Sequence, residues 1–261
     1  MIILMMALGL QTALACTNLI VGKKASVDGS VMCTYNCDGF GFSGSLFYSP
    51  SGRHEKGELI EIHGWGSSHQ GQYVKQVEYT YNVVGLMNEK QVTIVETTFD
   101  GRLELVNQEG LLDYFSLMRL ALQRSSTARE AIRCMVELVE EYGYNSSGET
   151  LTICDPKEAW IMEIVGKGPG HKGAVWVALR VPDDCICAHA NLSRIRQFPL
   201  EKHSKNSISS KNLMKINNPE VECVYAYDVI SFAKEWGFYI GKDEDFSFRD
   251  AYCPIDFENV R

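Results

Sequence analysis

Cys16 is the residue of this chain best placed to act as a nucleophile, because it follows an apolar stretch that ends in Ala13-Leu14-Ala15. Small residues at these two alanine positions are what a signal peptidase reads before its cut. Cleavage there would make Cys16 the first residue of the mature chain, with its thiol beside a free α-amine. A thiol titrates near 8.5 and an α-amine at about 7.7–8.0, so the amine can take the thiol proton near neutral pH. One residue would then supply both nucleophile and base.

Other interpretations of Cys16 are an ordinary buried cysteine, one half of a disulfide, or the lipid-bearing cysteine of a lipoprotein. The lipoprotein alternative is weakened by Ala13, since no leucine stands three residues before Cys16. The chain has nine cysteines, and full pairing of the other eight would leave Cys16 free. Sequence alone does not fix the pairing. Free buried cysteines are common, so we expect few bridges rather than four.

The first 15 residues form an uncharged apolar leader. A transmembrane helix needs about 20 apolar residues, so we expect removal of this leader and export to the periplasm or the extracellular space. A net charge of −8 without a basic run argues against nucleic-acid and anionic-membrane partners. Neither a CxxC nor an HExxH pattern is present, and Cys185 and Cys187 are too closely spaced for a usual zinc pair. We therefore expect no cofactor.

Two strands, 17–22 and 30–35, must position Cys16, and the Asp28-Gly29 turn indicates that they form a hairpin. Asn36 and Asp38 follow the second strand, and would lie close to Cys16 if the hairpin is in register. Asp38 is then either an exposed turn residue or the carboxylate that orients the amine and thiol.

Further strands are predicted at 80–87 and 91–97, joined by a hairpin. The second ends in Glu96-Thr97-Thr98, a polar segment after an apolar run, where a sheet edge can present groups to a site. Residues 39–75 are rich in Gly, Ser and His and are typical of substrate-facing loops.

Two amphipathic helices are predicted at 109–124 and 127–142. The second begins with a capping box, Thr127 with Glu130, and stops at Gly143. Both have apolar faces wide enough to cover a sheet. Strands at 150–154, 159–165 and 174–181 follow, and a last helix is expected at 226–236.

Asn191 follows a strand that ends in His189-Ala190. Asparagine commonly caps or turns the chain at such a point. Alternatively, its side-chain NH₂ group is a donor for a developing oxyanion.

The order of these elements suggests an α+β fold in which helices cover a sheet layer, and with Cys16 first it resembles the N-terminal nucleophile (Ntn) hydrolases. Five segments further resemble the dipeptidase A family of cysteine peptidases. They begin at Cys16 (CTNLIVGKKASVDGS), Asn88 (NEKQVTIVETT), Thr127 (TAREA), Glu158 (EAWIME) and Ala188 (AHANLSRI). Bile-salt hydrolases and penicillin V acylases are similar in the nucleophile region but more distant.

The resemblance implies a leader at 1–15 and a catalytic domain at 16–261 with a four-layer αββα sandwich that hydrolyses dipeptides. It makes Cys16 the nucleophile, its amine the base, Asp38 the residue that holds them and Asn191 an oxyanion donor. Asn36 and Thr98 would contact the substrate. Alternatives are an acylase acting on non-peptide amides, or an exported binding protein without catalysis. Oligomeric state stays open.

Two departures from the family accompany this resemblance. Much of the family has arginine where this chain has Tyr35, so substrate anchoring near the nucleophile must differ. The chain is also shorter than is usual for the family, and we expect the sandwich to be incomplete at its C-terminal end.

Overall fold

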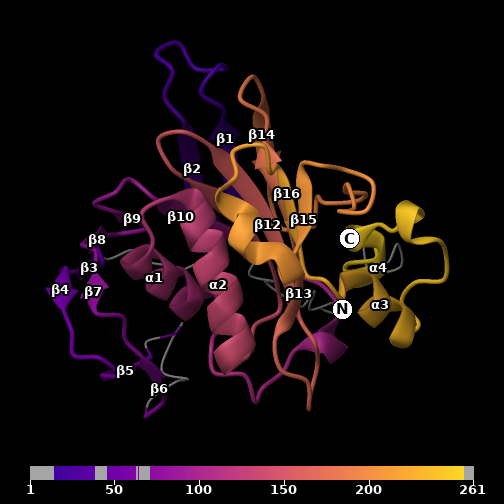
Figure 1. Ribbon diagram of the computed structural model, residues 1–261, viewed down its shortest axis with the longest axis horizontal. Helices are drawn as coiled ribbons and strands as arrows, with labels where there is room; N and C mark the ends of the chain where they lie inside the picture. The colour runs from indigo at the N-terminus through magenta and orange to yellow at the C-terminus, as the bar shows by residue number, and fades with distance from the viewer. Residues whose placement is uncertain (1–14, 39–45, 63, 65–70, 256–261) are drawn as a thin grey trace, which may run out of the picture.

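The computed structural model describes residues 15–38, 46–62, 64 and 71–255, and two sheets dominate it (Figure 1). The larger sheet has nine strands in the order β15-β16-β13-β12-β11-β10-β9-β8-β3. The smaller has three, in the order β14-β1-β2. The described chain is therefore of the α+β class, as predicted.

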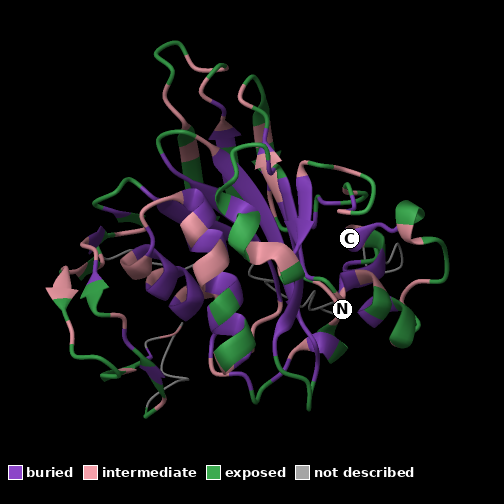
Figure 2. Cartoon of the chain, in the orientation of Figure 1, coloured by how far each residue is buried: buried purple, intermediate pink, exposed green. Residues whose placement is uncertain are grey.

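The centre of the large sheet consists of four long antiparallel strands whose residues are almost all buried (Figure 2). Strands buried on both faces need cover on both sides. Helices contact one side, and the small sheet contacts β10 and β11. These central strands are β10 (Thr93–Asp100), β11 (Gly148–Cys154), β12 (Ala159–Gly166) and β13 (Ala174–Val181).

The flanks of the large sheet are short strands. On one side β16 (Cys223–Tyr225) pairs antiparallel with β13, and β15 (Ser207–Ser209) pairs parallel with β16. On the other side lie β3 (Tyr48–Ser49), β8 (Val83–Val84) and β9 (Met87–Asn88). Two separate hairpin-like pairs complete this side: β4 (Gly52–Arg53) with β7 (Tyr79–Thr80), and β5 (Leu59–Glu61) with β6 (Tyr73–Lys75).

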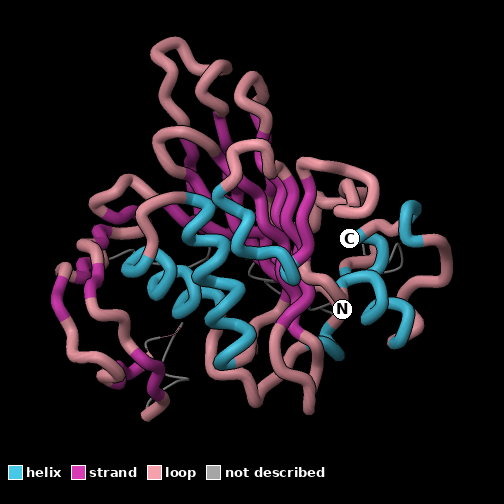
Figure 3. Tube along the Cα trace, in the orientation of Figure 1, coloured by secondary structure: helices cyan, strands magenta, loops and turns pink. Residues whose placement is uncertain are grey.

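Helices α1 (Tyr114–Arg124) and α2 (Ala128–Tyr142) lie against the large sheet (Figure 3). α1 begins later than predicted because Asp113 caps it, its carboxylate accepting from the Ser116 amide. α2 starts at the predicted Thr127 cap and stops at Gly143, whose φ of 81° suits glycine. The remaining helical elements are α3 (Val229–Glu235), α4 (Phe248–Tyr252), and the 3₁₀ turns Leu103–Leu105, Ser210–Asn217 and Asp243–Asp245.

The small sheet consists of β1 (Ala15–Val21), β2 (Met32–Asp38) and β14 (Ile186–His189). Cys16, Asn18 and Ile20 are buried, whereas Leu19, between them, is 40% exposed. The inner face of this sheet therefore packs on the large sheet, and its outer face is open in the described residues.

One predicted strand is wrong. Residues 80–87 do not form a continuous strand, because Gly85 adopts φ 57° and turns the chain between β8 and β9. The hairpin partner of β9 is thus β8, and only Met87 pairs with Thr93 of β10. A two-residue turn that contains glycine is a common hairpin connection.

Candidate active site

The β1–β2 hairpin places Cys16 at the start of its first strand, as predicted. In the register Cys16 lies opposite Cys37, and Asn18 lies opposite Tyr35. Opposed residues of an antiparallel pair point to the same face of the sheet. Cys37 and Tyr35 therefore share the inner face with the side chain of Cys16, a residue that is 9% exposed.

Asn36 and Asp38 lie on the other face, because they are opposite Thr17 and Ala15. Both are exposed, and the Nδ2 of Asn36 donates to the Oδ1 of Asp38 at 2.7 Å. Among the residues that the structure describes, no hydrogen bond or ion pair joins either side chain to Cys16. Their roles in catalysis and substrate binding stay predictions.

Asn191 joins Cys16 to the end of β10. Its Oδ1 accepts a hydrogen bond from the Cys16 backbone nitrogen at 2.7 Å, and its Nδ2 donates to the Thr98 carbonyl at 2.7 Å. The nitrogen that Asn191 holds is the one that leader removal would turn into the α-amine. The NH₂ group expected to meet an oxyanion is occupied by Thr98 here. Asn191 is thus placed to position the base, a role that the sequence did not indicate.

Thr98 is the third predicted residue in this cluster. Its hydroxyl donates to the Oε1 of Glu149 at 2.9 Å, across the β10–β11 pair. The side chain thus serves a neighbouring carboxylate, while the carbonyl serves Asn191. A contact between Thr98 and substrate stays a prediction.

A buried pair of glutamates was missed by the sequence reasoning. Glu96 and Glu149 are 3% and 1% exposed, and they lie on the adjacent strands β10 and β11. Burial raises the pKa of both carboxyls, and the charge of Glu96 raises that of Glu149 further. Tyr35 donates its hydroxyl to the Oε1 of Glu96 at 2.8 Å. A polar strand end at Glu96 and a second glutamate at the next strand's start were the available signals.

The thiol of Cys16 is strongly affected by this surrounding. Burial, followed by the charge of Glu96 and a hydrogen bond with Cys37, raises its pKa to about 12. The thiol is therefore neutral at pH 7 while residue 15 is still attached to the Cys16 nitrogen. Ionisation needs a positive charge or a base close by.

His189 fixes the strand that leads to Asn191. Its Nδ1 is 2.7 Å from the Thr97 hydroxyl, and its Nε2 is 2.6 Å from the Thr152 hydroxyl. The Thr97 hydroxyl also donates to the Ala190 carbonyl at 3.0 Å. Burial, and less strongly the charge of Arg194, lowers the pKa of His189 to about 4. A neutral imidazole with both nitrogens engaged holds β14 against the large sheet.

Glu163 fixes the chain on the other side of Asn191. Its carboxylate accepts from the Ser193 hydroxyl at 2.5 Å, from the Arg194 amide, and from the Ile195 amide at 3.2 Å. Burial raises the pKa of Glu163 to about 7. Asn191 is thus held between two buried polar anchors, which makes the position of its carboxamide well defined.

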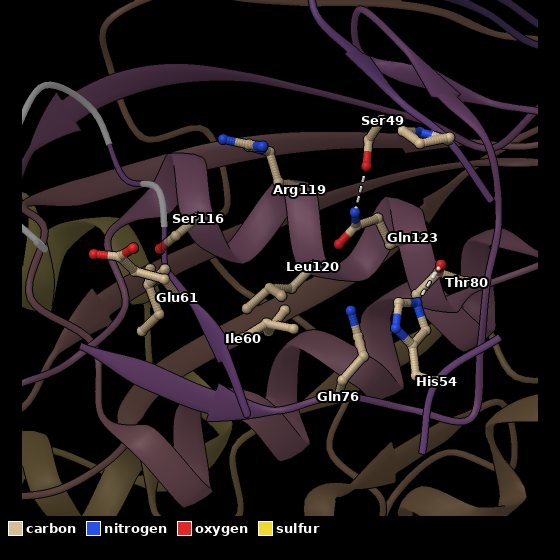
Figure 4. A pocket seen from close by; sticks show the side chains of 12 residues that line it. Ser49, His54, Ile60, Glu61, Gln76, Thr80, Ser116, Arg119, Leu120 and Gln123 are labelled. Atoms are coloured by element: carbon tan, nitrogen blue, oxygen red, sulfur yellow. Dashed lines mark hydrogen bonds between the residues drawn. The ribbon is translucent and has the colours of Figure 1, made fainter. Parts of the chain in front are cut away.

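A separate cavity of about 420 Å³ lies between α1 and the strands of residues 49–80 (Figure 4). His54 contacts the Thr80 hydroxyl at 3.0 Å, and Gln123 donates to Ser49 at 2.6 Å. Cys16 is not among its lining residues. The bond from Gln123 joins α1 to Ser49, whereas His54 and Thr80 join β7 to the chain that follows β4.

The structure gives two further results. All nine cysteines carry free thiols. Within the described ranges no helix is long and apolar enough to cross a membrane, and no group of three or more metal-ligating side chains gathers at one point.

Comparison with known proteins places the chain in a family. The family model described as Peptidase family C69 matches residues 15–49 and 65–261. A probable dipeptidase of Salmonella dublin is 25% identical over 269 residues, which cover 94% of this chain and 54% of that protein. A probable dipeptidase of Latilactobacillus sakei is 28% identical over 197 residues, covering 68% and 39%. The chain spans about half the length of these relatives or less, and its match to the family model over most of its residues shows that it belongs to peptidase family C69.

Proposed function

We propose that this chain, once its leader is removed, hydrolyses dipeptides with Cys16 as nucleophile and the Cys16 α-amine as base. The observation that carries the proposal is the 2.7 Å hydrogen bond between the Cys16 nitrogen and Asn191. It holds the future amine at the start of β1, on a residue whose thiol faces the large sheet. Relatives named as probable dipeptidases support the substrate class.

Leader removal is the activating step of this proposal. An amide nitrogen cannot take a proton, whereas an α-amine titrates at about 7.7–8.0. The new ammonium would also favour the thiolate that burial and Glu96 now disfavour. We place the cut after Ala15 and the mature protein outside the cytoplasm, with residues 16–261 as part of an αββα catalytic domain.

Asp38 gains a role in the same step. It lies opposite Ala15 in the β1–β2 register, so the cut removes the residue that it faces. The Asp38 carboxylate would then have access to the new ammonium and could hold it. Asn36, hydrogen-bonded to Asp38, would support that carboxylate and the adjoining substrate contact.

The reaction has two halves. The amine takes the thiol proton, sulfur attacks the scissile carbonyl carbon, and the resulting oxyanion collapses to break the C–N bond. The leaving amine takes the proton back from the ammonium, which leaves an acyl thioester on Cys16. The free amine then takes a proton from water, hydroxide attacks the thioester, and the carboxylic acid leaves as the thiol regains its proton. Asn191 and Thr98 would line this centre.

Cys16→Ala tests the mechanism. Turnover of dipeptides should fall by at least about 10³-fold, the scale seen when a covalent nucleophile is removed. Cys16→Ser should keep little activity, because a hydroxyl is a weaker nucleophile at this pH. Circular dichroism checks the fold of both variants, and Cys185→Ala, which removes an exposed thiol outside the site, is the matched control. Activity of Cys16→Ala equal to wild type would overturn the mechanism.

The mature N-terminus and the substrate panel test the remaining steps. Mass spectrometry should find a chain that begins at an unmodified Cys16. A chain that begins elsewhere, or a Cys16 with an acylated nitrogen, removes the base. Dipeptides should be cleaved in preference to a glycine-conjugated bile acid and a phenoxyacetyl amide, and the reverse order would favour an acylase.

A further inference from the structure

The glutamate pair beside Cys16 has an arrangement that catalysis by a thiol and an amine does not require. Glu96 and Glu149 point to the same face of the large sheet, since Thr98 is opposite Glu149 and two residues from Glu96. One oxygen of each is engaged, by Tyr35 at 2.8 Å and by Thr98 at 2.9 Å. The second oxygen of each is buried and has no hydrogen-bond donor among the described residues.

Two carboxyls that lie close together share a proton, because both cannot easily ionise at short distance. Burial raises the pKa of Glu149, and the charge of Glu96 raises it further, as expected of such a partner. A pair that shares one proton keeps one negative charge. A buried charge of this kind is costly unless a cation meets it.

The surroundings of the pair supply no such cation from the described residues. Within the described ranges, the side-chain donors to Glu96 and Glu149 are the hydroxyls of Tyr35 and Thr98. Neither of these is a lysine or an arginine. Tyr35 is a neutral donor. The charge is therefore open to a cation that arrives with a ligand.

A dipeptide brings a cation to this place. Its α-ammonium is bonded to the carbon next to the scissile carbonyl, so it lies within one residue of the sulfur that attacks that carbonyl. Hydrogen bonds place the pair beside Cys16: Asn191 joins the Cys16 nitrogen to the Thr98 carbonyl, and the Thr98 hydroxyl donates to Glu149. A carboxylate in this position can meet the ammonium of a peptide whose carbonyl lies at the sulfur.

We propose that Glu96, paired with Glu149, binds the α-ammonium of the substrate and restricts the enzyme to peptides with a free N-terminus. The inference deepens the proposed function and rests on it. It assigns Glu96 and Glu149 as specificity-determining residues of the site.

The experiment compares one dipeptide, Ala-Ala, with its N-acetylated form on the mature wild type, on Glu96→Gln and on Glu109→Gln. Glu109 is exposed, so its variant removes the same charge away from the site. Wild type and Glu109→Gln should prefer the free dipeptide by at least about 100-fold in kcat/KM, which is about 2.7 kcal/mol. Glu96→Gln should lose at least tenfold on the free dipeptide, mostly through KM, and little on the acetylated one.

Binding provides a readout that does not need turnover. In a Cys16→Ala background, calorimetry should show tighter binding of the free dipeptide than of the acetylated one, and Glu96→Gln should erase the difference. Equal cleavage of both substrates by wild type overturns the inference and leaves the proposed function standing. An unchanged preference in Glu96→Gln overturns it too, since the pair would then serve the fold or the Cys16 ammonium. No cleavage of either substrate, with no difference in binding, defeats both proposals.

Discussion

Two regions of the same sheet bury glutamates in opposite ways. Glu158, just before β12, lies between two guanidiniums: Arg129 contacts it at 2.5 and 2.9 Å, and Arg180 at 3.0 Å. Burial alone would raise the pKa of Glu158, but hydrogen bonds and charge from the two arginines outweigh it and lower that pKa. At Glu96 and Glu149 burial acts without an arginine, and both pKa values rise.

We infer from this difference that Glu158 stabilises the fold, whereas Glu96 and Glu149 serve the proposed ligand. Arg129 also donates to the carbonyls of Ile216 and Asn218 at 2.7 Å and lies over the Trp160 ring, so the Glu158 cluster ties α2 to the sheet. Glu96 and Glu149 accept hydrogen bonds from the hydroxyls of Tyr35 and Thr98, and a neutral side chain could accept the same bonds. A buried carboxyl pair without a cation among the described residues, beside the proposed nucleophile, is typical of a functional site.

Removal of the Glu158 carboxylate should have the largest effect on stability. Glu158→Ala leaves the buried Arg129 and the half-buried Arg180 without their shared partner, although Arg180 keeps Asp183. Breaking a buried ion pair in this way costs about 3–5 kcal/mol of unfolding free energy. Urea denaturation measures it, with the exposed Glu220→Ala as control. A loss below about 1 kcal/mol would show that the arginines do not depend on Glu158 and would weaken the contrast with Glu96.

Glu96→Gln should raise the unfolding free energy relative to wild type, whereas Glu158→Ala lowers it. The gain should depend on pH. Because the folded pKa of Glu96 is raised above the ordinary value of 4.5, the folded chain binds more protons than the unfolded chain above that pH. The contribution of Glu96 to the stability of the wild type therefore falls as pH rises from about 4.5 toward neutrality. Glutamine does not titrate, so the variant escapes most of this fall.

The measurement is the unfolding free energy of wild type and Glu96→Gln at pH 4 and pH 7.5. The variant should gain on wild type by about 1–3 kcal/mol between the two pH values, the cost of a buried group that lacks a partner. Glu109→Gln should show no such trend. A difference between Glu96→Gln and wild type that does not change with pH would mean that Glu96 is ionised and compensated in the folded chain.

Much of the fold could be predicted from local patterns. The Asp28-Gly29 turn and the alternation of 17–22 predicted the β1–β2 hairpin, and the Thr127 cap predicted the start of α2. The turn at Gly85 was missed, because a run of strand-forming residues on both sides concealed it. Local signals of this kind report one element at a time.

The candidate site depends on contacts that local patterns do not contain. Glu96 and Glu149 lie close together because β10 pairs with β11, although the connection between these strands contains both α1 and α2. Asn191 reaches Cys16 from 175 residues away, and its predicted partner was an oxyanion rather than the Cys16 nitrogen. The two-residue period of a strand could have shown that Asp38 faces away from the thiol, had the register been known.

Tyr35→Phe should produce the smallest of these effects and test whether Tyr35 and Glu96 act together. The change removes one hydroxyl that donates to Glu96 at 2.8 Å, at a cost of about 1 kcal/mol of unfolding free energy. The Tyr35 hydrogen bond lowers the pKa of Glu96, so its loss lets burial raise that pKa further. In a Glu96→Ala background the same change should cost almost nothing, because the acceptor is gone. Tyr48→Phe, which removes an exposed hydroxyl 3.4 Å from Asn82, is the matched control. If Tyr35→Phe lowers the unfolding free energy equally in both backgrounds, the hydroxyl contributes through packing and not through Glu96. The contrast between a neutral donor at Glu96 and the arginines at Glu158 would then fail.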